Sequence, residues 1–397
     1  MSVNIVDVGV STVRLVFLAD YPFPPPGLLY SDTDIPESAA LANVSPQILG
    51  ARQDQEDRYI TLPPGSLKSR KEIAIYAVYD GHGGTEVVNY VSQHLHEHLE
   101  QHLTNPTKAT SPVEYKIAIQ SALRSIDKDL DRDNLDGGST VTLALIDTKQ
   151  NLLVHANLGD SHAFFADHEP ASPQSLSPSS PTHGGGDTNS CSGLNWHVDC
   201  LSVEHAPDSP LEKQRIEKAG GEINYRSGIA RIGGVSMSRA LGDLDYKKPR
   251  VNRLAGHDLS DLIGVETGLA PGKKATHDLV SNKADFAVRM LHGQSLLLLA
   301  SDGVGDASQA EEVTRLAVDR WEQGKDAKEI AEELTSREGK MKGADNCTVV
   351  VVVLDTESKR RRSVDSGRRS FDVSGLDGSR RRRRSSITSL KEWIMDR

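Results

Sequence analysis

Residues 73–88, IAIYAVYDGHGGTEVV, place an acid, a histidine and three glycines directly after an apolar run. The run is short and rich in residues that favour strands, and a helix-like run follows it. Glycines between a strand and a helix often form a phosphate-binding loop. A nucleotide-binding loop would read Gly-x4-Gly-Lys-Ser/Thr or Gly-x-Gly-x-x-Gly, and this stretch has neither. A nucleotide-binding protein is therefore the less favoured alternative, and Asp80 and His82 become the candidates for chemistry.

The composition favours a globular protein and argues against several other classes. The 397 residues include 37% hydrophobic and 26% charged side chains, enough for one large domain or two ordinary ones. The longest apolar runs, SLLLLA and VVVVVL, are far shorter than the ~20 residues that a membrane span requires. A formal net charge of −10 argues against specific nucleic-acid binding, which needs a basic face.

The cysteines are few and show no metal or disulfide pattern. Cys191, Cys200 and Cys347 form neither a disulfide framework nor a Cys-x-x-Cys pair. None is followed six positions later by arginine, which removes the Cys-x5-Arg arrangement of cysteine-dependent phosphatases. Acids interrupt the apolar N-terminus, unlike a signal peptide. We therefore expect an intracellular protein, in the cytoplasm or the nucleus, with the mitochondrion left open.

Composition separates a central domain, residues 45–355, from three other segments. Residues 1–44 contain YPFPPPG and are predicted to be an irregular N-terminal extension. Residues 167–195 are rich in serine, proline and glycine and are predicted to be a low-complexity insertion. Residues 356–397 form a basic tail, predicted to be disordered, with 13 Lys and Arg against 6 Asp and Glu. The tail's net +7 leaves −17 on the rest of the chain.

The tail carries serines after runs of arginine, the pattern that basophilic kinases prefer. These serines are Ser363, Ser370, Ser385 and Ser386. A phosphate there would reduce the positive charge and alter docking. The arginine runs fit equally a nuclear-import signal, an anchor to an anionic surface, or a solvated segment without a defined partner.

Short strand-like runs alternate with helical ones between these segments, which predicts sheets covered by helices. The predicted strands are 73–79, 139–147, 151–157, 162–166, 296–300 and 348–354. The predicted helices are 85–103, 112–133, 209–219, 308–322 and 326–336. Ser-x-x-Glu patterns at 209–212 and 308–311 predict capping boxes at two of these helices.

Aspartates recur where the apolar runs begin or end. They are Asp57, Asp80, Asp160, Asp302 and Asp345. One such aspartate is usually a turn residue, but several gathered together would repel one another unless cations neutralised them. Mg²⁺ and Mn²⁺ prefer carboxylate and carbonyl oxygens. Two such ions ~3.5–4 Å apart can polarise a phosphoryl oxygen and convert water to hydroxide. The pattern therefore predicts a site for hard divalent cations.

Seven motifs follow one another along the chain: ARQDQEDRY, YDGHGG, DGGSTVTLALI, LGDSHA, GVSMSRALGDLDYK, ASDGVGD and ADNCTVVVV. In this order they resemble the metal-dependent, type 2C (PPM) serine/threonine protein phosphatases, from about Gly50 to Asp355. The resemblance implies an α+β fold, an αββα sandwich of two antiparallel sheets flanked by helices, with a metal site at one end between the sheets. We also expect a monomer that acts in signalling on phosphorylated protein substrates.

The resemblance implies a role for each matching residue. Asp80 would bridge two Mg²⁺ or Mn²⁺ ions. The metal ligands implied are Asp57, Asp80, Gly81, Asp302 and Asp345, with Glu56 acting through water. Asp160 and Asp306, with Asp302, match a weaker third metal site of some family members.

The resemblance also implies residues that handle the phosphate and the leaving group. Arg52 would bind phosphate, with a surface ion pair to Asp54 or Glu56 as the alternative. His82 would be the general acid that protonates the departing alkoxide, with a helix cap or the ordering of a water as alternatives. Asp243 is expected to fix the segment that flanks the site. His162 stands where arginine is usual, beside the third-metal position.

Two other groups of side chains could be functional, but a structural interpretation is favoured for both. Ser139 and Thr140 could be nucleophiles, but GST begins a predicted strand and the family uses water. His94, His98 and His102 recur at four-residue spacing and could hold a surface metal. An apolar stripe beside these histidines favours a solvated helix flank instead.

We therefore predict an Mg²⁺- or Mn²⁺-dependent protein-serine/threonine phosphatase. It would hydrolyse phosphoserine and phosphothreonine by attack of a water that bridges two ions. A pseudophosphatase that binds phosphorylated partners without turnover is the second alternative. All the core ligands that the resemblance implies are present, which weighs against it.

Overall fold

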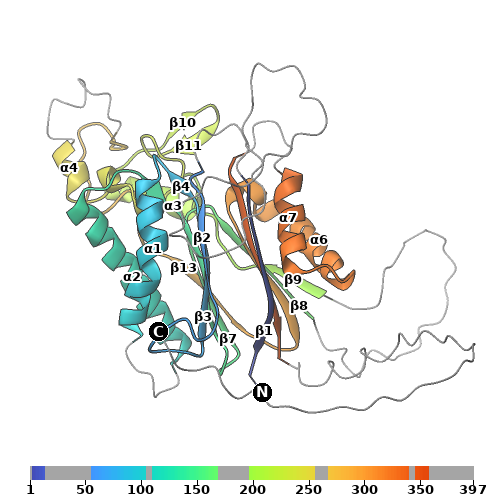
Figure 1. Cartoon of the computed structure of the whole chain (residues 1–397). Helices are drawn as coiled ribbons and strands as arrows, with labels where there is room; N and C mark the ends of the chain where they lie inside the picture. The colour runs from blue at the N-terminus through green and yellow to red at the C-terminus, as the bar shows by residue number, and fades with distance from the viewer. Residues whose placement is uncertain are drawn as a thin grey trace, which may run out of the picture. The chain divides into compact units, whose positions relative to one another are not determined.

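Figure 1 shows the computed structural model of the chain, which describes residues 2–13, 55–103, 110–168, 196–254, 267–338 and 345–356. Contacts divide the chain into two units, Met1–Ser358 and Lys359–Arg397. The second unit, with the four serines that follow arginine, lies outside the described residues, as do residues 169–195 of the insertion. No helix within the described ranges is long and apolar enough to cross a membrane.

Two five-stranded antiparallel sheets form the centre of the first unit. One has the order β1-β15-β14-β8-β9, with bounds Asn4–Val13, Cys347–Asp355, Gln294–Ala300, His162–His168 and Trp196–Cys200. The other has the order β13-β7-β6-β3-β2, with bounds Asp285–Met290, Leu152–Leu158, Val141–Asp147, Ile73–Tyr79 and Arg58–Leu62. A short third sheet, β12-β5-β4, comprises Leu241–Gly242, Gly138–Ser139 and Gly81–His82.

Helices cover the outer faces of the two large sheets, so the layers run helix, sheet, sheet, helix (Figure 1). Helices α1 (Glu86–His102) and α2 (Pro112–Asp133) pack on the β3 side. Helices α6 (Ala310–Glu322) and α7 (Ala327–Glu338) pack on the β15 side, α6 preceded by the 3-10 turns η2 (Asp302–Val304) and η3 (Ala307–Gln309). This is the αββα sandwich that the resemblance implied.

Both faces of each central strand are apolar, because each face is covered by a different core. In β3, Ile75 and Ala77 belong to the core under α1 and α2, whereas Tyr76 and Val78 belong to the core between the sheets. Because successive strand residues point to opposite faces, a strand between two layers must be apolar throughout. The VVVVVL run of β15 is buried in the same two-sided way.

A smaller lobe lies near β4 at one end of the sandwich (Figure 1). It contains α3 (Pro210–Ala219), the hairpin β10–β11 (Asn224–Arg226 and Ile229–Arg231), the 3-10 turn η1 (Leu244–Tyr246) and α4 (Arg250–Leu254). The lobe has its own core, which includes Ile216, Met237 and Leu279. It therefore supplies a wall beside the end of the sheets.

The sequence located the central strands and helices well but erred at the N-terminus. Residues 1–44 were expected to be irregular, yet Asn4–Val13 forms β1 and pairs with β15 along its length. Asp7 Oδ2 accepts a hydrogen bond from the first backbone N–H of α7, at Ala327, 2.8 Å away. The prediction failed because the alternating pattern of β1 is weak and its partner lies at the other end of the domain.

Both predicted capping boxes are wrong. Ser209 makes no side-chain cap, and Glu212 is held by Arg239 of the lobe instead. At 306–309 the box is shifted, because Asp306 caps η3 and Gln309 returns the bond to its backbone. A capping box that the sequence analysis did not single out, Ser111 with Glu114, begins α2.

The contact of β1 with α7 gives a stability prediction. A Cβ added at Gly9 would lie 2.0 Å from the backbone carbonyl carbon of Ala327. We expect Gly9→Ala to lower the free energy of unfolding by about 1–3 kcal/mol or more, the cost of forcing an extra methyl group into a filled contact. Urea unfolding would measure this loss. Val6→Ala, on the same strand but 39% exposed, is the control and should lose less. Equal loss in the two variants would contradict the contact.

Candidate active site

The expected acids meet at one end of the sandwich because of how the strands pair. Arg58 of β2 is registered with Tyr79 of β3, so Asp57 and Asp80 emerge side by side. Asp160 follows β7, which runs antiparallel to β6 in the same sheet. In the facing sheet, Asp302 follows β14 and Asp345 precedes its partner β15. The structure thus brings together residues from five separate places in the sequence.

Hydrogen bonds join the two sheets at this end. The Ser301 hydroxyl donates to Asp57 Oδ2 at 2.8 Å, and the backbone N–H of Glu56 donates to Asn346 Oδ1 at 2.9 Å. Arg58 donates to the backbone carbonyls of Gln55 and Asp57, which holds the segment that carries the acids. Each of these bonds fixes a residue next to an expected ligand. They keep the cluster assembled despite its charge.

The carboxylates of the cluster raise one another's pKa. Burial, together with the charges of Asp302 and Asp345, raises the pKa of Asp57 to about 7 against the opposing hydrogen bonds from Ser301 and Thr348. Burial and then Asp57 hold the pKa of Asp80 well above its usual range. Buried like charges disfavour ionisation in this way unless an opposite charge joins them. An added positive charge would therefore favour the ionised form of these carboxylates.

The chemistry of these groups fits hard cations. Asp160 Oδ1 and Asp57 Oδ1 are buried without a hydrogen-bond partner among the residues that the structure describes. No three His, Cys, Asp or Glu side chains within the same ranges already form a metal-binding group. The fit therefore rests on charge, burial and unsatisfied oxygens, which are the properties that Mg²⁺ or Mn²⁺ would satisfy. Gly81 adds room, because a Cβ there would lie 2.7 Å from the Glu56 carbonyl oxygen.

His82 is paired with Asp243. The two side chains meet at 2.8 Å between Nε2 and Oδ2. Burial lowers the pKa of His82, but the charge and hydrogen bond of Asp243 outweigh it, so the net pKa is raised. His82 Nδ1 is buried and has no hydrogen-bond partner within the described ranges. A protonated His82 would therefore keep one proton toward Asp243 and have another to give from Nδ1.

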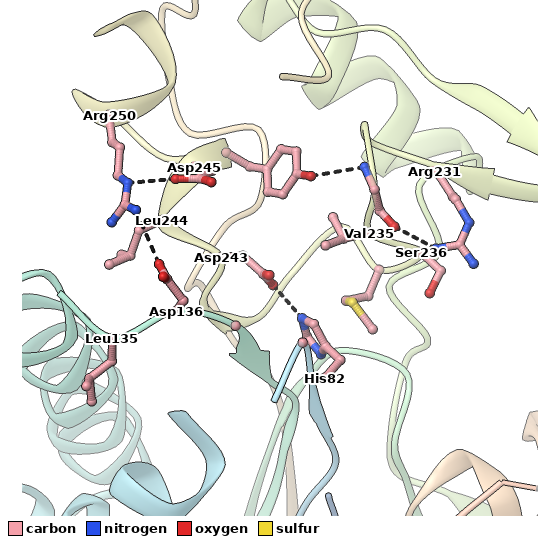
Figure 2. Close-up of a pocket in the computed structure, with 15 residues that line it drawn as sticks. His82, Leu135, Asp136, Arg231, Val235, Ser236, Asp243, Leu244, Asp245 and Arg250 are labelled. Carbon is pink, nitrogen blue, oxygen red and sulfur yellow. Dashed lines mark hydrogen bonds and ion pairs between the residues drawn. The ribbon is translucent and has the colours of Figure 1, made fainter. Parts of the chain in front are cut away.

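Figure 2 shows this pair on the wall of a pocket of about 480 Å³. The pocket lies between the turn after α2 and the lobe. Its apolar lining includes Leu135 and Leu244, and its basic lining consists of Arg231 and Arg250. Arg250 is itself bound to Asp245 at 2.6 Å, and Arg231 donates to the Gly234 carbonyl. The pocket is thus a mixed polar and apolar space that opens beside His82.

The residues of the possible third metal site are only partly gathered. Burial, followed by the charge of Asp302, raises the pKa of Asp160 to about 7. Asp306 lies farther out, where its Oδ1 accepts from the Ser308 and Gln309 backbone. Its charge acts on Glu204, whose pKa is raised mainly by burial. Glu204 is a further acid that the sequence analysis missed, since it follows no regular apolar run.

Thr140 and the histidines of α1 occupy structural positions. The hydroxyl of Thr140 donates to or accepts from Ser161 at 2.8 Å, and its Oγ1 also accepts from the Asp80 N–H. It therefore positions Asp80. On α1 the histidines contact different neighbours, for example His98 with Asp129 at 2.9 Å, beside a buried stripe that includes Leu95.

The remaining expected residues lie beside the cluster, except for one outside the described part of the chain. Arg52 lies outside the described residues. His162 is buried and its Nδ1 meets Ser202 Oγ at 3.3 Å. Glu56 Oε1 accepts from the Gly84 N–H at 3.0 Å, which fixes the turn after His82. Arg58, Ser301 and Asn346 support the cluster but were not singled out, although each adjoins an acid that was.

The raised pKa values predict how stability depends on pH. With a folded pKa of about 7 against 3.8, Asp57 and Asp160 bind protons that the unfolded chain releases. The stability that protonation contributes is complete below about pH 4 and is lost as the pH rises through about 7. We expect the Tm of the metal-free protein to fall between about pH 5.5 and about pH 8, and Mg²⁺ or Mn²⁺ to reverse the fall at the higher pH.

Two variants make this stability test specific. Asp57→Asn removes one of the titrating groups, so its Tm should depend less on pH. Asp131→Asn, an exposed position on α2, should follow the unmodified protein. If the Tm of the metal-free protein stays constant or rises over the same pH range, the raised pKa values of Asp57 and Asp160 are contradicted.

Comparison with known proteins shows which family the chain resembles. A family model described as "Protein phosphatase 2C" matches residues 42–347. The chain is 31% identical over 312 residues to "Probable protein phosphatase 2C 45" of Oryza sativa subsp. japonica, covering 76% of this chain and 84% of that protein. It is 28% identical over 326 residues to "Protein phosphatase 2C 1" of Paramecium tetraurelia, covering 78% and 90%.

A solved structure shares the fold. The crystal structure of serine-threonine phosphatase 2C from Toxoplasma gondii superposes with a TM-score of 0.54 at 22% identity, covering 77% of this chain and 92% of that one. The motifs, the sandwich and the matched family model agree. The chain belongs to the protein phosphatase 2C family.

Proposed function

We propose that this protein is an Mg²⁺- or Mn²⁺-dependent phosphatase that hydrolyses phosphoserine and phosphothreonine in proteins. The observation that carries the proposal is the buried acidic cluster beside the His82–Asp243 pair. The cluster supplies sites for cations, and the pair supplies a proton donor. A scaffold that only bound phosphorylated partners would have no need of a positioned acid.

The metal ligands that we propose are Asp57, Asp80, Asp302, Asp345 and the Gly81 carbonyl, with Glu56 acting through water. Divalent cations bound there would supply an activated water and offset the charge of the phosphoryl oxygens. Asp160 and Asp306, with Asp302, are proposed for a weaker third ion. Arg52 is proposed to bind the phosphate, since a guanidinium matches two phosphate oxygens.

His82 would act on the leaving group. As the bond from phosphorus to the serine or threonine oxygen breaks, electrons pass to that oxygen, and Nδ1–H supplies its proton. Asp243 stabilises the protonated ring through Nε2–H, which explains the raised pKa of His82. The products are the free hydroxyl and inorganic phosphate. The leaving polypeptide would then occupy the pocket, because His82 forms part of its wall.

Removal of a proposed ligand tests the function directly. We expect the purified protein to release phosphate from a phosphothreonine peptide with Mn²⁺ or Mg²⁺, and chelation to stop the reaction reversibly. Asp302→Ala should abolish turnover at any ion concentration. Asp319→Ala, exposed on α6, is the control. A folded protein that shows no metal-dependent turnover would favour the scaffold alternative.

The role of His82 predicts a dependence on the leaving group. His82→Ala should lower kcat for a phosphopeptide by about 10²–10⁴-fold, the usual contribution of a general acid. The same variant should hydrolyse p-nitrophenyl phosphate with a loss of less than about 10-fold, because its phenolate leaves without a proton. Equal losses on both substrates would indicate that His82 serves the metal site or the fold instead.

A further inference from the structure

Asp127 is a buried carboxylate on α2 that belongs to none of the site residues described above. Its neighbours along that face of the helix, including Leu123 and Leu130, are apolar core residues. A charge in such a position is costly unless it is paired and hydrogen-bonded. Its partners therefore show what it is there to hold.

Three donors bind this carboxylate. The backbone N–H of Gly242 donates to Oδ1 at 2.9 Å. The Lys247 ammonium donates to Oδ2 at 2.6 Å, and Asn282 Nδ2 donates to the same oxygen at 2.8 Å. Lys247 also donates to the Ala240 carbonyl at 2.8 Å. Asp127 thus fixes both ends of one turn, residues 240–247.

That turn carries Asp243 in an unfavourable backbone conformation. Gly242 has φ +72°, and Asp243 follows it with φ +47°, in the left-handed region that side chains other than glycine seldom adopt. The turn is further tied by the bond from the Asp243 N–H to the Gly137 carbonyl, 2.8 Å long. Strained backbone of this kind persists only where surrounding contacts hold it.

We infer that Asp127 is a positioning residue for the proposed general acid. It holds the Gly242 backbone and, through Lys247, the far end of the turn, so that the Asp243 carboxylate reaches His82 Nε2. Asp127 is not one of the residues that line the pocket beside His82. The inference rests on the proposed function, since it assigns Asp127 to the proton-donating half of the site and not to the acidic cluster.

The first test again compares two leaving groups. Asp127→Leu with Lys247→Met replaces the ion pair by apolar side chains, an exchange that often preserves stability. We expect kcat for the phosphopeptide to fall by about 10-fold or more, part of the ~10²–10⁴-fold that a general acid supplies. Turnover of p-nitrophenyl phosphate should stay within about twofold. Asp127→Asn, which keeps the shape but loses the charge, should show the same selectivity.

A partly buried ion pair elsewhere controls for loss of stability. Glu72 lies 2.6 Å from Arg70 at the start of β3, opposite the end that carries Asp80. Glu72→Gln should affect both substrates equally, as a purely structural change would. If the Asp127 variants, checked for a retained thermal transition, also affect both substrates equally, or affect neither, the inference is overturned.

A double-mutant cycle separates the proposed path from an independent effect. In an Asp243→Asn background the Asp127 substitution should add almost no further loss on the phosphopeptide, because both act through His82. If the losses in kcat caused by the Asp127 and Asp243 substitutions multiply, Asp127 acts elsewhere and the inference is refuted. Absence of turnover in the unmodified protein would instead refute the proposed function, so the two failures are distinguishable.

Discussion

Several carboxylates are buried together at one end of the sandwich, and their cost has to be met by the remainder of the fold. Asp57 and Asp80 flank two different strands, and burial, followed by the charges of neighbouring carboxylates such as Asp302, raises the pKa of both. Folding alone would avoid such a cluster, because each carboxylate loses water without gaining an opposite charge. The cations that we propose would supply the opposite charge that makes this arrangement favourable.

The sandwich can bury these carboxylates because the remainder of each strand is apolar on both faces. The strands that end in the cluster are buried by helices on one side and by the opposing sheet on the other. Cross-sheet bonds at the acidic end, such as that from Ser301 to Asp57, fix the ends against separation. The same end also carries the lobe, whose pocket opens beside His82 (Figure 2). The acidic cluster, the His82–Asp243 pair and the pocket thus adjoin one another.

The two halves of the site are supported by different parts of the fold. Strand register and glycine packing place the acids, whereas a turn of the lobe places Asp243 against His82. That turn is anchored to α2 through Asp127, which lies outside the acidic cluster. Helix α2, which covers a sheet, therefore also holds the turn that carries Asp243.

The motifs in the sequence were enough to assign the family and to predict which residues carry the chemistry. The order of seven motifs identified the family, and the position of acids at strand ends indicated a site for hard cations. Continuous apolar runs located β3, β14 and β15, because burial on both faces leaves a clear local pattern. Local pattern failed for β1 and for the capping boxes. The strand depends on pairing with β15, and Glu212 binds Arg239 of the lobe in preference to its own helix end.

Contacts between side chains that are distant in the sequence could not be predicted from the sequence. Nothing in the spacing of His82 and Asp243 shows that they meet, since they are separated by 161 positions and joined by the short β12-β5-β4 sheet. The same holds for Glu204 beside Asp306 and for Asp127 beneath Gly242. A motif preserves the chemical type of a residue, but a hydrogen bond depends on distance and angle. Those are set by strand register and packing, so the pairings became visible only in the folded chain.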